Sequence, residues 1–314
     1  MNHLITLRDW TKEQIDEVID LAVKIKKSPE NFYDTMHRKV LVMIFEKPSL
    51  RTRVSFETGM CRMGGHAIYY DMANSPLGAG KETIHDTAKT LSRYSDLIMA
   101  RLFAHKNIEE MARYADIPVI NGLTDFNHPC QVLSDLMTIR EKKGEIKGLT
   151  LAYLGDAKNN VTHSLLYGCS KMGVNINVGC PEGEDFSPLQ GVLDDCNPIC
   201  DKSGAVVKLT HDPLEAVKGA DIIYTDSWMS YHVPSEELEN RVKALKPFQV
   251  DVIKMQLGAP DVIFMNCLPA MRGYEQTSEV IDGPHSVVFD QAENRLHCQK
   301  AIMVKLLEGF TSDA

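Results

Sequence analysis

The sequence has no apolar run that approaches the roughly 20 residues a membrane-spanning helix needs. Residues 1–6 have no signal-peptide pattern. Acidic residues outnumber basic residues, and the formal net charge is −9. This charge argues against a nucleic-acid partner. Gly155-Asp156-Ala157 lacks the Gly-x-Gly-x-x-Gly fingerprint, which argues against a dinucleotide enzyme. These absences favour a cytoplasmic protein that binds neither membrane nor nucleic acid.

The eight cysteines show no spacing that is typical of a structural metal site. Cys196 and Cys200 flank Asn-Pro-Ile, but no second ligand pair lies nearby in the sequence. We therefore expect no metal, and we expect free thiols in a reducing compartment.

A length of 314 residues suits two domains of about 150 residues each. Thr11 and Gln14 form a capping box before an amphipathic helix. Short apolar runs then alternate with helical patterns, which is typical of parallel sheets covered by helices on both faces. Strands are predicted over residues 40–45, 67–70, 97–100, 119–121, 149–154, 175–178, 206–209, 222–225 and 262–265. The first three intervening helices are predicted over residues 54–63, 83–93 and 108–114.

The predicted fold is α/β, with two domains that each contain a parallel β-sheet flanked by helices and are joined by interdomain helices. The first domain covers residues 1–138 and is joined by a returning C-terminal helix at about 290–314. The second covers residues 139–289. Helical patterns at 129–143 and 292–307 are the candidates for the connecting helices.

The segment Ser49-Leu50-Arg51-Thr52-Arg53 follows the first predicted strand and leads into a helix beginning near Arg53. A helix start offers N–H groups and a positive dipole end, and here hydroxyls and guanidinium groups are added to it. The pattern predicts an anion site; the alternative is an exposed basic loop.

Other polar residues also follow predicted strands. In open parallel sheets, ligands bind at the carboxyl ends of the strands. The clusters are Arg101, His128 to Gln131, Gly155 to Asn160, Asp226 to Ser230, and Asn266 to Pro269.

These motifs resemble those of the aspartate/ornithine carbamoyltransferase family. Ser-Leu-Arg-Thr-Arg is similar to the family's Ser-Thr-Arg-Thr-Arg motif, and His-Pro-Cys-Gln at 128–131 is similar to its His-Pro-x-Gln. The resemblance implies a carbamoyl phosphate site, no metal or organic cofactor, and a homotrimer or a multiple of trimers. The implied carbamoyl phosphate-binding residues are Ser49, Leu50, Arg51, Thr52, Arg101, His128, Gln131, Cys267, Leu268 and Arg295.

The second-substrate motifs resemble those of the ornithine-specific members. Cys-Leu-Pro at 267–269 is similar to their His-Cys-Leu-Pro, and Asp-Ser-Trp-Met-Ser at 226–230 is similar to their Asp-x-Trp-x-Ser. The resemblance implies transfer of a carbamoyl group from carbamoyl phosphate to L-ornithine by direct attack of the neutral δ-amine. The implied catalytic residues are Arg101, His128, Asp226 and Cys267, and the implied ornithine-binding residues are Asn160, Asp226, Ser230 and Tyr231.

Several alternatives stay open from the sequence. Asp226 is also a candidate helix N-cap, Cys267 a buried small hydrophobe, His128 a structural histidine and Arg295 a surface arginine. Leu50, Asn266 and Tyr231-His232 depart from the family pattern, and the loop at residues 75–81 lacks the expected glutamine. Lys81 is the candidate phosphate contact of that loop. Another amine acceptor such as putrescine, or a non-catalytic homologue, therefore remains an alternative.

Overall fold

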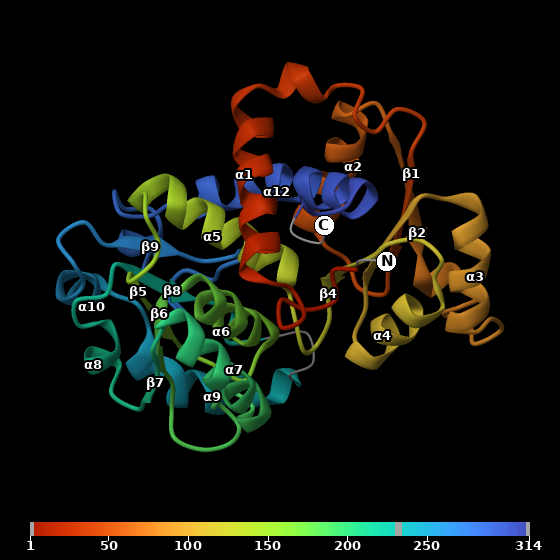
Figure 1. The fold of residues 1–314 in the computed structure, drawn as a ribbon. Helices are drawn as coiled ribbons and strands as arrows, with labels where there is room; N and C mark the ends of the chain where they lie inside the picture. Colours follow the sequence, from red (N-terminus) through yellow and green to blue (C-terminus); the bar gives the residue numbers. More distant parts are fainter. Residues whose placement is uncertain (1–2, 230–233, 312–314) are drawn as a thin grey trace. The chain divides into compact units, whose positions relative to one another are not determined.

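The computed structural model describes residues 3–229 and 234–311 (Figure 1). The chain divides into two compact units, Met1–Met137 with Glu293–Ala314, and Thr138–Ala292. The two boundaries fall within helices α5 (Pro129–Lys143) and α12 (Val288–Glu308). These two helices therefore connect the units.

The first unit contains a four-stranded parallel sheet in the order β2-β1-β3-β4. Strands β1, β3 and β4 are almost entirely buried, as expected for a parallel sheet with both faces covered, whereas the edge strand β2 is partly exposed. Its elements are α1 (Lys12–Lys27), η1 (Pro29–Phe32), β1 (Val40–Phe45), α2 (Leu50–Arg62), β2 (His66–Asp71), η2 (Met72–Asn74), α3 (Ile84–Tyr94), β3 (Leu97–Arg101), α4 (His105–Tyr114) and β4 (Val119–Leu123).

Helix α1 begins at the predicted capping box, in which Thr11 accepts the N–H of Gln14 and Gln14 accepts the N–H of Thr11. Its predicted apolar face is buried. The C-terminal helix α12 returns to this unit, where Lys305 pairs with Glu17 of α1 at 2.6 Å (Figure 1). The N- and C-terminal helices of the chain therefore belong to one core.

The second unit contains a five-stranded parallel sheet in the order β7-β6-β5-β8-β9. An apolar core of side chains from β5, β8, β9 and the helices α8, α10, α11 and α12 fills one region beside it. Its elements are β5 (Thr150–Leu154), α6 (Asn160–Met172), β6 (Asn175–Gly179), α7 (Gln190–Ser203), β7 (Val207–Thr210), α8 (Pro213–Val217), β8 (Ile222–Thr225), η3 (Ser235–Glu237), α9 (Leu238–Leu245), η4 (Lys246–Phe248), α10 (Val252–Leu257), β9 (Ile263–Met265) and α11 (Ser278–Ile281).

The predicted fold class is confirmed, since both sheets are parallel and flanked by helices. Some predicted helix starts were wrong. Helix α2 begins at Leu50 rather than near Arg53, because the Ser49 hydroxyl accepts the Thr52 N–H and caps it there. Helix α4 begins three residues before Ile108, because Asp125 from a distant loop accepts the His105 N–H.

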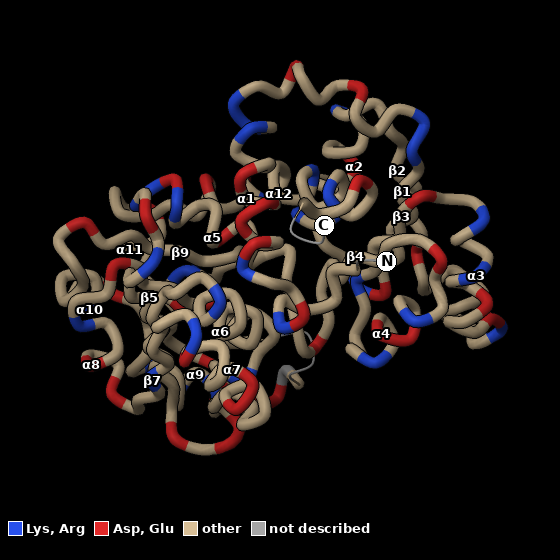
Figure 2. Tube along the Cα trace, in the orientation of Figure 1, with Lys and Arg blue, Asp and Glu red and all other residues tan. Residues whose placement is uncertain are grey.

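Acidic and basic residues are mixed along both units, so neither shows an extended run of one sign (Figure 2). Over the residues that the structure describes, no helix is both long and apolar enough to span a membrane.

Candidate active site

The first group of predicted site residues gathers where β1 leads into α2. Ser49 is the N-cap of α2, and its hydroxyl accepts the Thr52 N–H at 3.3 Å. The first N–H groups of a helix have no intrahelical carbonyl to bind, so those of Leu50 and Arg51 suit an anion. A phosphate-like group is the natural ligand for this helix start.

Arg295 joins this helix start to helix α5. Its guanidinium donates to Gln131 Oε1 at 2.6 Å and to Thr52 Oγ1 at 3.3 Å. Arg295 is only 2% exposed, so the surface alternative is wrong. Gln131 also donates to Asp135 Oδ1 at 2.8 Å, which orients its amide. Three residues predicted from separate motifs therefore form one hydrogen-bonded group.

His128 lies in a buried, positively charged environment. Burial lowers its pKa well below the usual value, and the nearby cations Arg295, Arg101, Lys47 and Arg51 lower the pKa further. The imidazole is therefore neutral at physiological pH and can offer one ring N–H to a ligand oxygen.

Lys47 adds a cation that was not among the predicted site residues. Its side chain is buried, with Nζ 4.5 Å from the centroid of the Phe103 ring. Burial, and then the charge of Arg101, lower the pKa of Lys47 to about 8. Its charge is therefore sensitive to mildly alkaline pH.

Three residues of the motif and of the loop at residues 75–81 are exposed. The Leu50 side chain is 73% exposed and apolar, so only its backbone can take part in anion binding. Arg53 pairs with Glu57 at 3.0 Å and stacks over Tyr69 at 3.9 Å, away from the anion-binding residues. Lys81 is exposed at the end of the loop at residues 75–81.

A second group of predicted site residues lies in the second unit, after the adjacent strands β8 and β9. The Cys267 thiol donates to Asp226 Oδ1 at 3.0 Å, and the same oxygen accepts the Ser227 N–H at 2.7 Å. Residues 227–229 are not helical, so Asp226 is not a helix N-cap. Cys267 is partly exposed rather than fully buried. The pair combines a carboxylate and a thiol beside neighbouring strand ends.

The turn after Cys267 is organised by Asn266, which was not among the predicted site residues. Its Oδ1 accepts the Leu268 N–H at 2.7 Å, and its amide donates to Gln276 Oε1 at 3.1 Å. The Leu268–Pro269 peptide bond that follows is cis. Leu268 was expected to contact carbamoyl phosphate, and its N–H is already bound to Asn266.

Asn160 is the first residue of α6, directly after the end of β5 and the N-cap Asn159. It is partly buried and therefore remains a candidate for contact with a ligand. The predicted ornithine-binding residues Ser230 and Tyr231 lie outside the described residues.

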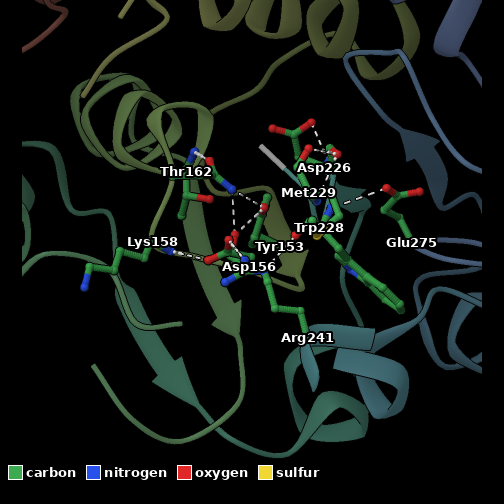
Figure 3. Close-up of polar contacts among 11 residues, drawn as sticks. Tyr153, Asp156, Lys158, Thr162, Asp226, Trp228, Met229, Arg241 and Glu275 are labelled. Atoms are coloured by element: carbon green, nitrogen blue, oxygen red, sulfur yellow. Dashed lines mark hydrogen bonds and ion pairs between the residues drawn. The ribbon is translucent and has the colours of Figure 1, made fainter. Parts of the chain in front are cut away.

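Three charged residues that were not among the predicted site residues surround the loop that carries Asp226 (Figure 3). Glu275 accepts the Trp228 N–H, Arg241 donates to the Trp228 carbonyl, and Asp156 pairs with Arg241. Their positions in the sequence give no signal for this role, because their partners are 13 to 85 residues away.

The described residues contain no group of three or more His, Cys, Asp or Glu side chains placed to bind a metal ion. What the two units offer instead is an anion-binding helix start in one and a carboxylate–thiol pair in the other. In parallel-sheet proteins such strand ends bind ligands, and here they suit an anion in the first unit and a cationic group in the second.

Comparison with known proteins agrees with this arrangement. Residues 2–141 match the carbamoyl-P binding domain of aspartate/ornithine carbamoyltransferases, and residues 147–306 match their Asp/Orn binding domain. The chain therefore belongs to the aspartate/ornithine carbamoyltransferase family.

Relatives named as ornithine carbamoyltransferases are similar over nearly the whole chain. An ornithine carbamoyltransferase of Anoxybacillus flavithermus is 48% identical over 305 residues, which is 96% of both chains. The solved ornithine carbamoyltransferase of Pyrococcus furiosus is 48% identical with a TM-score of 0.93, covering 98% of this chain and 97% of that one. The ornithine transcarbamoylase structure from Giardia lamblia has a TM-score of 0.89 at 43% identity and covers 97% of each chain.

The charge of Lys47 leads to a prediction about pH. Lysine is cationic below its pKa, so raising the pH from 7 to 9 removes most of the Lys47 charge. Sulfate, used here as a phosphate-like anion, stays a dianion over this range, so only the charge of the protein changes. We expect its affinity to fall by up to about tenfold. Calorimetric titration with sulfate at both pH values checks this. The control is Lys47→Gln, which should bind sulfate more weakly and show no difference in affinity between the two pH values. If sulfate affinity fell equally between pH 7 and 9 in Lys47→Gln, the pH dependence would arise from a group other than Lys47.

Proposed function

We propose that the chain transfers the carbamoyl group of carbamoyl phosphate to the δ-amine of L-ornithine, forming L-citrulline and phosphate. The observation that carries the choice of acceptor is the Asp226–Cys267 pair, because a carboxylate suits a cationic amine and repels the second carboxylate of aspartate. The ornithine-specific names of the relatives support the same acceptor over putrescine.

The first unit is proposed to bind carbamoyl phosphate. Ser49, Arg51, Thr52 and Arg101 surround the capped helix start and would neutralise the charge that develops on phosphate as it leaves. Neutral His128 and Gln131 would donate to the carbamoyl oxygen. Arg295 holds Gln131 and Thr52 together and so links the two ends of this ligand.

The second unit is proposed to bind ornithine, with Asn160 at the α-amino-acid end together with Ser230 and Tyr231. Asp226 and Cys267 would orient the δ-amine, and the adjacent cis turn at Leu268 would help to hold the carbamoyl group.

In the reaction, the lone pair of the neutral δ-amine forms a bond to the carbamoyl carbon. The bond from that carbon to the phosphate oxygen then breaks, and phosphate leaves with the electron pair. The nitrogen transfers one proton to the departing phosphate, which gives the neutral ureido product. Rate enhancement would come mainly from positioning and from charge stabilisation, without a covalent intermediate or a cofactor.

A homotrimer or a multiple of trimers is proposed, with a contact surface on the first unit. Val54 of α2 and Ile68 of the edge strand β2 are 48% and 44% exposed, and Leu50 on the same side of α2 as Val54 is more exposed still. Apolar groups at an unpaired sheet edge favour association. The loop at 75–81 would reach a neighbouring site through Lys81.

We also place the protein in the cytoplasm. All eight cysteines lie in the described part of the chain and are free thiols, as expected in a reducing compartment.

Arg51→Ala is expected to lower kcat/KM for carbamoyl phosphate by about a hundredfold or more, because it removes a charge that stabilises the leaving phosphate. Arg62→Ala, at the other end of the same helix and exposed, is the matched control and should stay within about threefold of wild type. Initial rates of ureido product formation measure both. Activity of Arg51→Ala within tenfold of wild type would refute its role.

The acceptor assignment is tested with ornithine, putrescine, lysine and aspartate as carbamoyl acceptors. We expect a strong preference for ornithine, and we expect Asp226→Asn to lower kcat/KM for ornithine by at least about tenfold, since a charge-assisted hydrogen bond is lost. Preference of the wild type for putrescine would replace the proposed acceptor. Absence of turnover with all four would reject the proposed reaction.

The assembly is tested by light scattering after size-exclusion chromatography. Wild type is expected at three times the chain mass of 35.2 kDa, or a multiple of that. Val54→Asp should shift the mass toward the monomer, because it places a charge on the proposed contact surface. Val206→Asp, at a similarly exposed apolar position in the second unit, should leave the mass unchanged. A monomeric wild type would overturn the proposal.

A further inference from the structure

The backbone of Trp228 is held from two sides by buried charged side chains (Figure 3). Its N–H donates to Glu275 Oε1 at 3.3 Å, and its carbonyl accepts from Arg241 Nε at 2.9 Å. Trp228 lies two residues after Asp226, so these bonds fix the path of the loop that presents the Asp226 carboxylate.

Arg241 on α9 is itself fixed by charge. It forms a buried ion pair with Asp156, which follows β5, and its guanidinium lies 5.1 Å from the centroid of the Phe186 ring. Asp156 Oδ1 also accepts the Lys158 N–H at 3.0 Å. One side of the Trp228 backbone is therefore tied to the end of another strand of the same sheet.

Glu275 binds the Trp228 backbone from the other side, and it also binds a second loop. Its Oε2 accepts the Met271 N–H at 2.9 Å, while its Oε1 accepts the Trp228 N–H. Trp228 belongs to the loop after β8 and Met271 to the turn after β9, which begins with Cys267. One carboxylate thus joins the two segments that present Asp226 and Cys267.

The environment of Glu275 is unusual for a structural carboxylate. The side chain is 1% exposed, and it accepts backbone N–H groups that include those of Trp228 and Met271, whereas the described residues form no ion pair with it. Burial raises the pKa of Glu275, the backbone hydrogen bonds lower it, and the charge of Asp226 raises it further. Carboxylates in such surroundings are common at functional sites.

We propose that Glu275 is a positioning residue for the acceptor amine, which holds the Asp226 loop and the Cys267 turn in one relative arrangement. The inference rests on the proposed function, because it assigns Asp226 and Cys267 to the ornithine δ-amine. Glu275 acts only through these two segments and does not touch the substrate.

Glu275→Gln tests this directly. The amide has a single acceptor oxygen, so one of the two backbone N–H groups loses its partner and faces an NH₂ group. We expect the KM for ornithine to rise by about tenfold or more. Sulfate affinity at the donor residues should stay within about twofold, because the first unit is untouched.

L-Norvaline separates positioning from general damage, because it has the α-amino-acid end of ornithine but no δ-amine. Its inhibition constant in Glu275→Gln should change by less than about threefold. Glu275→Asp keeps both oxygens and the charge, and it should recover part of the ornithine affinity. Asp221→Asn is the matched control, since Asp221 accepts the Thr150 N–H at the opposite end of the same sheet, and it should leave the KM unchanged.

An ornithine KM in Glu275→Gln within twofold of wild type would overturn the inference. Equal losses of affinity for ornithine and L-norvaline would also overturn it, because they would indicate a general structural role. If the glutamine variant does not fold, Glu275→Asp provides the same comparison. Absence of ornithine turnover by the wild type would instead refute the proposed function itself.

Discussion

All described strands run parallel within their sheets, and the placement of the reactive side chains depends on this constraint. Parallel strands end at one edge, so residues that follow different strands are brought together without being close in sequence. Asp226 and Cys267 follow the adjacent strands β8 and β9, which places a carboxylate and a thiol 3.0 Å apart. In the first unit, the same rule gathers the ends of β1, β3 and β4 around the start of α2.

The two units then differ in charge. Arg51, Arg101 and Arg295 surround a histidine that burial and their charges keep neutral. The second unit places Asp226 and Glu275 close enough to influence one another, with Arg241 compensated by Asp156. Concentrating like charges costs free energy in each folded unit, and a ligand of opposite charge offsets part of that cost. The opposite signs fit a phosphate donor and a cationic amine acceptor.

Local chemistry was predictable from the sequence. The α1 capping box and the strand at residues 40–45 were located correctly, because their signals lie within a few residues. The start of α2 was misplaced because Ser49 was treated as an anion ligand and not as the helix cap that it also is. The sequence did not decide whether Arg295 lies on the surface or in the site, since its partners Gln131 and Thr52 lie 164 and 243 residues away. Contacts at such separations follow from packing, which no local pattern encodes.

The same limit explains why Glu275 and Asn266 were missed as organisers of the acceptor residues. Neither was expected to touch a ligand, and their hydrogen bonds are made largely to backbone N–H groups of loops. A backbone N–H is present at almost every residue. A side-chain motif therefore does not indicate which backbone N–H groups will need a buried acceptor. The motif residues carry the proposed chemistry, whereas Glu275 and Asn266 bind the backbone of the two segments that present Asp226 and Cys267. Under the proposed function, substitutions at Glu275 or Asn266 are therefore expected to alter the acceptor site while every motif residue remains the same.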